Sequence, residues 1–544
     1  MIDSGWNTRI RTVTDWLLLA GFCAFLFFYG LGSFGLIGAD EPRYAQVARE
    51  MLERHDWITP TLGGVPWLEK PALYYWEAML SYRVFGVSDW AARVPSAVDA
   101  TLMVFAVYFF LRRFRPGSHL DGALIVASSA GIIGFSRAAS MDMPLTATLA
   151  IALLGWYGWY ESQSRRCLAM FYAFLALGTL AKGPVAPFLA VVIISIFVLA
   201  KGDLSLVKRT LWLPGLLLFL LIAAPWYIAV QVKNPQFFRE FILEHNLARF
   251  GTKLYHHPEP FWYYLPVILL GLVPWSVLVV AATCETAWAW IAEKREMLRA
   301  EDAFNAFLLV WLAVPLIFFS FSQSKLPGYI VPALPAGALL LAEYVRRHTA
   351  DNERPNFLWI IGHSILAASL IVPTLMIVYI LQQRHLPWNH ASQVSCVLAA
   401  ILAAGIAITL LRSSGMRLLR FVTLIPVVLS VAALLRIGAP VLDDALSARP
   451  LLNDIARMED VNALPPLAVF AVPRETEYGL TFYRNQAMLQ YEPGKIPPQT
   501  HIVVAPQAAR ELIRKVLRNR RVSYLGTFQP QKMDYYWVAQ AGSL

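Results

Sequence analysis

Repeated apolar runs, each about 20 residues long, constrain this chain more than any other feature of its sequence. Hydrophobic residues make up 57% of the 544 positions and charged residues only 15%. A soluble globular protein does not need so much apolar surface, so we predict membrane-spanning helices, about thirteen in number. They cover approximately residues 14–37, 90–111, 119–135, 142–160, 167–181, 183–200, 211–232, 261–283, 303–321, 328–346, 357–381, 391–411 and 418–437.

The charges that flank these runs predict the orientation of the chain. Arg9 and Arg11 precede the first run and no small-residue cleavage site follows it, so we expect an uncleaved anchor with a cytoplasmic N-terminus. Alternation then assigns basic short loops, such as 112–115 and 293–299, to the cytoplasm, as the positive-inside rule requires. An odd number of spans places the C-terminal segment outside the cytoplasm.

The first outer loop, residues 38–89, carries more chemistry than a connector between two spans needs. Asp40 and Glu41 stand where the chain leaves the first run, and either carboxylate is expected to cap a short helix with Pro42 in its first turn. Apolar side chains then recur at helical spacing, which predicts a helix lying in the membrane interface. They are Tyr44, Val47, Ala48, Met51 and Leu52.

The same loop continues through a stretch rich in proline and glycine, residues 59–66, which is typical of a hairpin. Glu69 and Lys70 follow it directly. Because carboxylates, cations and aromatic side chains gather at one face of the membrane, we interpret this loop as a binding or catalytic site.

Two further turns on the same side carry charges. Arg137 and Asp142 lie at the mouth of two predicted spans, and Lys182 lies at the turn between two others. A structural explanation is open for each of the last two. Asp142 suits the N-cap of the following helix, and Lys182 suits a side chain that reaches the headgroups from the end of its helix.

The second long outer loop, residues 233–260, contains aromatic side chains at helical spacing, which predicts another interfacial helix. His245, Asn246 and Arg249 cluster toward its end as candidate binding residues.

Two adjacent histidines in that loop, His256 and His257, are candidate ligands of a divalent metal such as zinc, together with Glu69. Adjacent side chains in an extended segment point in opposite directions, so a pair of solvated or hydrogen-bonded histidines is the alternative.

Prolines and a glycine between residues 320 and 337 would break a helix at membrane depth. Irregular backbone at that depth is tolerated only where it is buried in protein or lines a cavity. We therefore predict that Ser324, Lys325 and Tyr329 line a cavity.

From residue 439 to residue 544 the composition becomes that of a soluble domain. The pattern predicts a small α/β domain without a phosphate loop, a dinucleotide fingerprint or a nucleophile elbow, which favours a lid or docking role. Its expected strands are 467–472, 479–483, 501–505 and 535–539, with a helix over 508–519. Residues 1–438 form the expected transmembrane domain, including the outer loops 38–89 and 233–260.

The net charge of +10 belongs partly to the topology and partly to the outer loops. Cations at a membrane surface suit anionic headgroups or phosphates, and ordinary pairing with neighbouring acids is the alternative. The four cysteines lie in or near predicted spans, so no structural disulfide is expected.

Several motifs together resemble the GT-C superfamily of integral membrane glycosyltransferases. They are Asp-Glu at the exit of the first span, TPTLGGVPWLEKPALYYW at 59–76, the Arg…Asp-x-Pro turn at 137–144, Leu-Ala-Lys-Gly-Pro at 180–184 and Ser-x-x-Lys-x-x-x-Tyr-x-x-Pro at 322–332. Within the superfamily the chain is similar to the bacterial lipid A 4-amino-4-deoxy-L-arabinose transferases, which are relatives of the protein O-mannosyltransferases.

The resemblance implies an undecaprenyl phosphate-linked sugar donor, a lipid A phosphate acceptor and a periplasmic active site in the bacterial inner membrane. It further implies lower sensitivity to polymyxin and other cationic antimicrobial peptides. Asp40 matches the first catalytic carboxylate and Asp142 the second acidic position, while Lys70 and Arg43 match cations near the donor phosphate. Glu69 and the two histidines would form a structural metal site, and the chemistry requires no cofactor. We expect a monomer that contacts membrane lipids and no nucleic acid.

Our candidate substrate-binding residues are Glu41, Arg43, Tyr44, Lys70, Arg137, Lys182, His245, Asn246, Arg249, Ser324, Lys325 and Tyr329. Another polyprenyl-phosphate sugar transferase, acting on protein or glycan, is the alternative within the same class. A transporter or flippase would place ionisable groups at the bilayer midplane and often repeat internally. Here the charges gather in outer loops and the first-loop motif is not repeated, which favours an enzyme.

Overall fold

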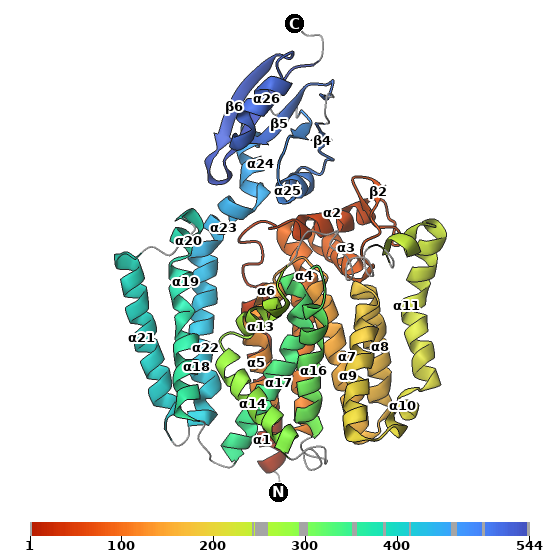
Figure 1. The fold of residues 1–544 in the computed structure, drawn as a ribbon, viewed down its shortest axis with the longest axis vertical. Coiled ribbons are helices and arrows are strands. Elements are labelled where there is room, and N and C mark those ends of the chain that lie inside the picture. Colours follow the sequence, from red (N-terminus) through yellow and green to blue (C-terminus); the bar gives the residue numbers. More distant parts are fainter. Residues whose placement is uncertain are drawn as a thin grey trace.

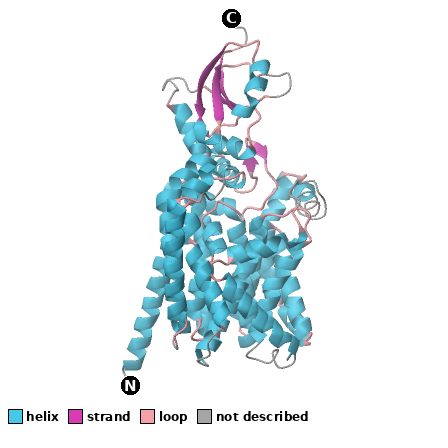
Figure 2. Ribbon diagram, turned by 60° about the vertical axis from the view of Figure 1, so that its left-hand side comes forward, coloured by secondary structure: helices cyan, strands magenta, loops and turns pink. Residues whose placement is uncertain are grey.

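The computed structural model describes residues 3–241, 244, 259–292, 303–350, 356–383, 388–412, 415–457, 465–491 and 496–540. A bundle of roughly parallel helices forms most of the molecule, and a smaller α/β unit stands on one end of it (Figures 1 and 2). The N-terminus lies at the opposite end of the bundle from this unit (Figure 1).

The helices of the bundle follow one another along the chain, with the two outer loops inserted after η1 and after α11. They are α1 (Asp3–Cys23), η1 (Ala24–Phe28), α4 (Asp89–Phe114), α5 (His119–Ser128), α6 (Ala130–Ser136), α7 (Asp142–Ser162), α8 (Arg165–Lys182), α9 (Val185–Lys201), α10 (Ser205–Thr210), α11 (Leu213–Lys233), η3 (Phe261–Tyr263), α13 (Tyr264–Gly271), α14 (Ser276–Ala292), α16 (Ala303–Ser320), η4 (Pro327–Ala333), α17 (Leu334–Ala350), α18 (Phe357–Ser369), α19 (Ile371–Leu375), α20 (Ile377–Gln383), α21 (His390–Leu410), α22 (Gly415–Ala433) and η5 (Leu434–Gly438).

Among the described residues, seven helices are long and apolar enough to cross a membrane, or up to nine if each of two bent helix pairs is one span. The bent pairs are α5 with α6 and η3–α13 with α14. The chain is therefore a multi-pass membrane protein. Helices α7 and α8 also occupy two of the expected runs, but the total of about thirteen spans stays a prediction.

The first outer loop folds into α2 (Asp40–Glu53) and α3 (Leu73–Phe85), which lie across the end of the bundle beneath the α/β unit (Figure 1). The expectation that an acid caps α2 is wrong, because Ala39 is the N-cap residue and no side-chain cap bond forms there. The carboxylate of Glu41 instead accepts a hydrogen bond from the amide of Ile37, 2.8 Å away.

The apolar stripe of α2 faces protein rather than a membrane interface. Tyr44, Val47, Ala48 and Met51 are buried in one cluster with tyrosines of α3 and with Phe482 of the α/β unit. The periodicity therefore predicted the helix and its apolar face, while the neighbouring elements decided what covers that face.

The proline- and glycine-rich stretch forms the expected hairpin, with β1 (Thr61–Leu62) antiparallel to β2 (Val65–Pro66). Gly63 and Gly64 both have positive φ, of 62° and 78°, which a two-residue turn of this kind requires. Glu50 of α2 holds the turn, since its carboxylate accepts hydrogen bonds from both glycine amides, at 2.8 and 3.1 Å.

The C-terminal unit, which we define as α23 to β7, carries a five-stranded sheet in the order β4-β3-β5-β7-β6. Strands β4, β3 and β5 are parallel, and β7 is antiparallel to both β5 and β6. Its elements are α23 (Ala439–Leu446), α24 (Ala448–Ala456), β3 (Leu467–Val469), α25 (Arg474–Arg484), β4 (Leu489–Gln490), β5 (His501–Pro506), η6 (Gln507–Ala509), α26 (Arg510–Val516), β6 (Val522–Phe528), η7 (Gln529–Gln531) and β7 (Met533–Val538).

One expectation for this unit was wrong. Residues 479–483 belong to helix α25 rather than to a strand, because acids in the first turn and Arg484 in the last complement the helix dipole. Asn485 then ends the helix in the left-handed conformation. Strand β6 was not expected, since its alternation of polar and apolar residues is weak.

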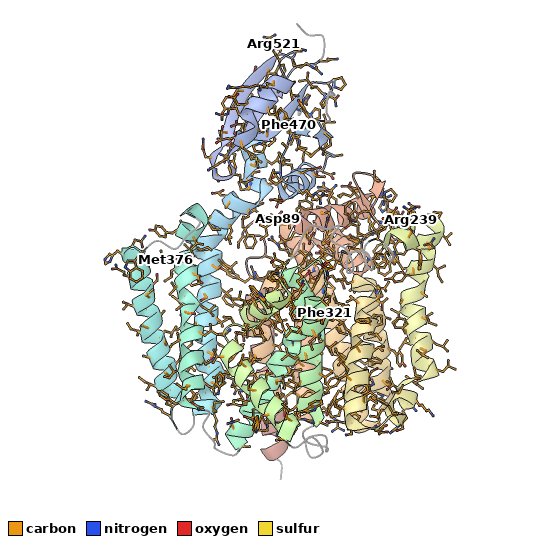
Figure 3. All side chains as sticks on the ribbon, in the orientation of Figure 1. Asp89, Arg239, Phe321, Met376, Phe470 and Arg521 are labelled. Carbon is orange, nitrogen blue, oxygen red and sulfur yellow. The ribbon has the colours of Figure 1, made fainter. Side chains whose placement is uncertain are left out.

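The C-terminal unit and the bundle meet around α2, α24, α25 and the start of α4. Asp89, the first residue of α4, lies at this junction (Figure 3) and forms an ion pair with Arg449 of α24. The unit is thus attached to the same end of the bundle that carries the first outer loop.

Candidate functional site

Glu41 is the buried anchor of the first outer loop. Arg93 of α4 binds it at two points, with Nε 3.0 Å from Oε1 and Nη2 2.6 Å from Oε2. Oε1 also accepts the amide of Ala139 and Oε2 the amide of Ile37, both at 2.8 Å. Glu41 therefore joins the first loop to α4 and to the turn before α7, and its oxygens are already occupied.

Asp40, in contrast, is half exposed. Among the described residues its one ion pair is with Arg43, one turn along α2, and its side chain is 51% exposed against 13% for that arginine. The neighbouring acids thus differ in what they can do, because only Asp40 has a carboxylate open to a ligand.

Aromatic side chains surround the guanidinium of Arg43. It lies 5.0 Å from the ring centroid of Tyr44, 5.2 Å from that of Trp67 and 5.8 Å from that of Tyr478, which belongs to the C-terminal unit. Burial acts to lower the pKa of Arg43, but Tyr44, Asp40 and Glu69 outweigh it, so the pKa is raised and the cation persists. Cation–π contacts of this kind fix the direction of the side chain.

Three buried donors near Arg43 have no hydrogen-bond partner among the described residues. They are Nε of Arg43 itself, Nε1 of Trp67 and the hydroxyl of Tyr75. Buried polar groups are nearly always paired in native structures, and ordered water or a ligand can supply the missing acceptors.

Asp142 forms a second acid–cation pair, with Lys182 at the end of α8. The ammonium of Lys182 also lies 4.9 Å from the ring centroid of Tyr329. Gly328 packs so closely that a Cβ atom there would lie 2.5 Å from the carboxyl carbon of Asp142. The start of α7, the end of α8 and the 3-10 helix η4 therefore converge on this carboxylate.

Arg137 binds backbone rather than Asp142 among the described residues. Its guanidinium donates to the carbonyls of Leu26, Tyr29 and Gly30, at 3.0, 2.9 and 2.9 Å. Burial, followed by the charge of Arg93, lowers the pKa of Arg137 to about 10.

One cavity of about 560 Å³ connects the two carboxylates. Asp40, Glu41, Arg137 and Asp142 line its polar part. The remaining walls are mainly apolar and come from α6, α19, α22 and η5, with Val273 and Pro274. Such a cavity suits an amphipathic ligand with an anionic or sugar-bearing head and a hydrocarbon tail.

Within the described part of the chain, Ser324 and Lys325 do not belong to the lining of this cavity. Both are buried, and the ammonium of Lys325 donates to the carbonyls of Glu259 and Ser322, at 2.9 and 2.6 Å. The hydroxyl of Ser324 has no hydrogen-bond partner in the described part of the chain.

Comparison with known proteins identifies the fold. A family model described as dolichyl-phosphate-mannose-protein mannosyltransferase matches residues 69–228. The crystal structure of ArnT from Cupriavidus metallidurans bound to undecaprenyl phosphate is similar with a TM-score of 0.75, at 19% identity and over 99% of both chains. The chain therefore has the fold of that structure.

Sequence relatives agree with this assignment. Proteins named undecaprenyl phosphate-alpha-4-amino-4-deoxy-L-arabinose arabinosyl transferase are 30% identical in Edwardsiella ictaluri and 33% identical in Pseudomonas aeruginosa. The alignments cover 63% and 66% of this chain, and 61% and 65% of those relatives. The chain thus matches less than two thirds of the length of these relatives in sequence.

Several predicted site residues of this chain stay untested. Lys70 is half buried in the loop before α3, and beside it Glu69 acts electrostatically on Arg43. His245, Asn246, Arg249, His256 and His257 lie outside the described residues. In the described part of the chain no group of three or more His, Cys, Asp or Glu side chains could hold a metal, so the proposed metal site rests on residues that the structure does not describe.

Sequence reasoning missed Arg93, Arg449 and Tyr478. The sequence did contain a signal for Arg93, because a charged residue within an apolar span generally has a functional or structural role. Arg449 and Tyr478 belong to elements far along the chain, and their sequence surroundings do not indicate that they reach the first loop.

Proposed function

We propose that this GT-C protein transfers 4-amino-4-deoxy-L-arabinose from undecaprenyl phosphate to phosphate groups of lipid A at the periplasmic face of the inner membrane. The observation that carries the proposal is that Asp40 and Asp142, each paired with a cation, line one amphipathic cavity. The names of the sequence relatives and of the ArnT structure support the choice of sugar and lipid carrier.

The leaving group sets the first requirement of this chemistry. Breaking the bond between the sugar and the lipid phosphate leaves negative charge on the phosphate, so fixed cations stabilise it where it develops. Lys182 and Arg43 are placed at the two carboxylates, and cations of this kind bind phosphate oxygens. We assign Lys70 the same role.

The sugar carbon sets the second requirement. It passes through an oxocarbenium-like state that a nearby carboxylate stabilises. The half-exposed Asp40 suits this role, or that of pairing with the sugar amine. A phosphate acceptor is already anionic near neutral pH and needs no general base, whereas a hydroxyl acceptor would require Asp40 to take its proton.

A second candidate function is transfer of another sugar from a polyprenyl phosphate to protein or glycan. The match of residues 69–228 to the mannosyltransferase model is the observation that favours it. In either case we place the N-terminus in the cytoplasm and the C-terminal unit in the periplasm, and we expect a monomer.

Mass spectrometry of lipid A tests the proposal. A bacterial host that makes the donor is compared with and without this chain, and with Asp40→Asn. We expect a mass increment of one aminopentose that Asp40→Asn abolishes while the variant stays in the membrane. No increment despite good expression would contradict the lipid A function, and glycosylated protein or glycan would then be sought.

A further inference from the structure

Residues 26–37 form the segment that leads into the first outer loop. Side chains of other elements hold it, rather than backbone pairing with a strand. Arg137 binds the carbonyls of residues 26, 29 and 30, and Arg93 binds those of residues 31, 34 and 35. Arg449 binds the two carbonyls between them, those of Gly32 and Ser33, at 3.2 and 3.5 Å. Three arginines from three distant parts of the chain thus fix one short segment.

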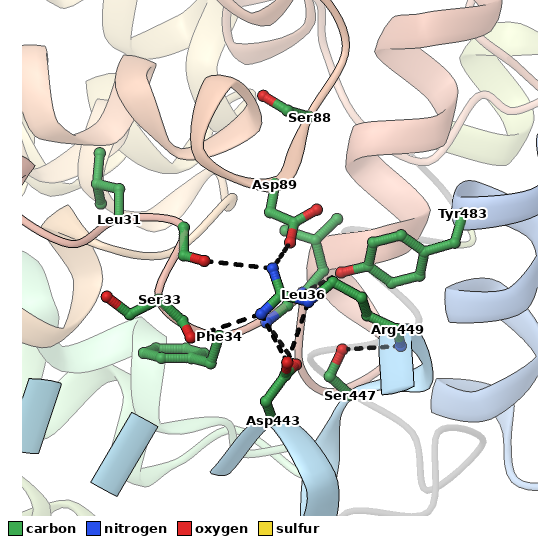
Figure 4. A network of polar contacts seen from close by, with 12 residues as sticks. Leu31, Ser33, Phe34, Leu36, Ser88, Asp89, Asp443, Ser447, Arg449 and Tyr483 are labelled. Carbon is green, nitrogen blue, oxygen red and sulfur yellow. Dashed lines mark hydrogen bonds and ion pairs between the residues drawn. The ribbon is translucent and has the colours of Figure 1, made fainter. Parts of the chain in front are cut away.

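Arg449 is the contribution of the C-terminal unit to this segment. Its guanidinium also forms ion pairs with Asp89, at 2.5 Å, and with Asp443, at 2.6 Å. Figure 4 shows Arg449 between these two carboxylates, with Ser33 and Phe34 beside it. Because Asp89 starts α4 and Asp443 belongs to α23, the arginine ties the bundle to the unit.

The amides of the segment are bound by the same unit. Gly35 donates to Oδ1 of Asp443, at 2.8 Å, and Leu36 donates to the hydroxyl of Tyr483 on α25, at 2.7 Å (Figure 4). Ile37 then forms an isolated antiparallel bridge with Ser447. Asp40 follows three residues after Ile37, so the backbone that leads into it is held by the C-terminal unit.

The unit also reaches the cation that is paired with Asp40. The guanidinium of Arg43 lies 5.8 Å from the ring centroid of Tyr478, which belongs to α25, the helix that carries Tyr483. The segment before Asp40 and the guanidinium that binds Asp40 are therefore both in contact with α25.

We propose that Arg449 is a positioning residue for sugar transfer, which fixes Asp40 against the donor by locking residues 32–37 onto the C-terminal unit. This inference rests on the proposed function, because it assigns Asp40 the role given there. The C-terminal unit then contributes to the active site. Its contact with residues 32–37 is required for turnover rather than for substrate binding.

Steady-state kinetics of the purified full chain test this role. In Arg449→Ala we expect kcat to fall about 10- to 100-fold, with KM for the undecaprenyl phosphate-linked donor within about threefold of wild type. Arg449→Lys keeps the charge but loses the planar fork, so we expect an intermediate kcat.

A matched control separates positioning from loss of stability in the unit. Arg510→Ala breaks the ion pair with Asp534, 2.8 Å, inside the C-terminal unit and away from the segment. We expect its kcat to stay near wild type. Equal losses in Arg449→Ala and Arg510→Ala, or a wild-type kcat in Arg449→Ala, would overturn the inference. A wild-type chain without transferase activity would instead overturn the proposed function.

Amide hydrogen exchange gives a readout that needs no substrate. In Arg449→Ala we expect the amides of Gly35 and Leu36 to exchange at least about tenfold faster than in wild type or Arg510→Ala. Unchanged exchange of these amides would overturn the inference even if no donor can be turned over.

A covalent replacement of the contact completes the test. Ile37 and Ser447 face each other across an antiparallel bridge, a separation that a disulfide can span. In the Arg449→Ala background, Ile37→Cys with Ser447→Cys should regain at least about fivefold in kcat on oxidation and lose it on reduction. Formation of the disulfide without recovery of kcat would overturn the positioning role.

Discussion

Glu41 and Arg93 form a two-point ion pair that is almost entirely shielded, with side chains 8% and 1% exposed. The arginine also binds three carbonyls of the segment before Asp40, and the carboxylate accepts two backbone amides. Two adjacent acids at the start of α2 thus have different environments. Glu41 holds the site together, and Asp40 is left open to a ligand.

Glu41→Gln should therefore destabilise the protein. Removing one partner of a buried pair leaves Arg93 charged and unpaired, which costs about 3–5 kcal/mol. Thermal unfolding in detergent is the measurement, with Asp40→Asn as the control. We expect a lower Tm for Glu41→Gln alone, and an unchanged Tm with lost transfer for Asp40→Asn. Equal stability of the two variants would contradict the anchor role.

Asp142 and Lys182 should act as one unit. Asp142→Asn and Lys182→Met are each expected to lower kcat/KM by about 10²-fold, because the pair stabilises charge that develops during transfer. The double variant should lose little more than the worse single variant, since residues in contact couple strongly. Fully multiplicative losses in this double-mutant cycle would show that the two side chains act independently.

Gly328→Ala should distort the second carboxylate. An added Cβ would lie 2.5 to 2.6 Å from the carboxyl atoms of Asp142, so either the acid or η4 must move. We expect at least about a tenfold loss of transfer and a stability cost of about 1–3 kcal/mol. Gly405→Ala is the control, because its Cβ would meet no heavy atom within 4 Å. Wild-type activity in Gly328→Ala would mean that the site tolerates the shift.

His501 should make the C-terminal unit sensitive to acid. The pKa of His501 is lowered, mainly because the ring is buried and also because Arg520 is close by. The hydrogen bond to the carbonyl of Gln499 acts in the opposite direction but is outweighed. The neutral ring fits its partners, since Nδ1 donates to that carbonyl at 2.7 Å and Nε2 accepts from Tyr491 at 2.6 Å.

The direction in which pH changes the stability of the C-terminal unit follows from proton binding. Below the ordinary histidine pKa of about 6.5, the unfolded state binds the proton more readily than the folded state. The neutral ring therefore contributes its stability above a pH of about 6.5. This stability is lost as the pH falls through the lowered pKa that His501 has in the folded state. Amide exchange of β5 in the full chain, corrected for intrinsic rates, should be faster at pH 5.5 than at pH 7.0. His501→Gln should remove this difference, and a wild type without it would contradict the prediction.

Local patterns in the sequence determined much of this protein. Apolar runs predicted the helices of the bundle, because burial of a continuous apolar surface depends on residues that are close in sequence. Gly63 and Gly64 predicted the hairpin, because a two-residue turn needs positive φ. The charged first loop, and the GT-C resemblance that it carries, predicted the acids that line the cavity.

Only the tertiary structure decided which charges meet. Glu41 and Asp40 are neighbours in sequence, and nothing local distinguishes the one that Arg93 buries from the one left open. Arg449 reaches Asp89 across 360 positions of the chain. Which partner a charged side chain finds depends on the burial and geometry that distant elements impose when they pack. A local sequence pattern does not contain that information.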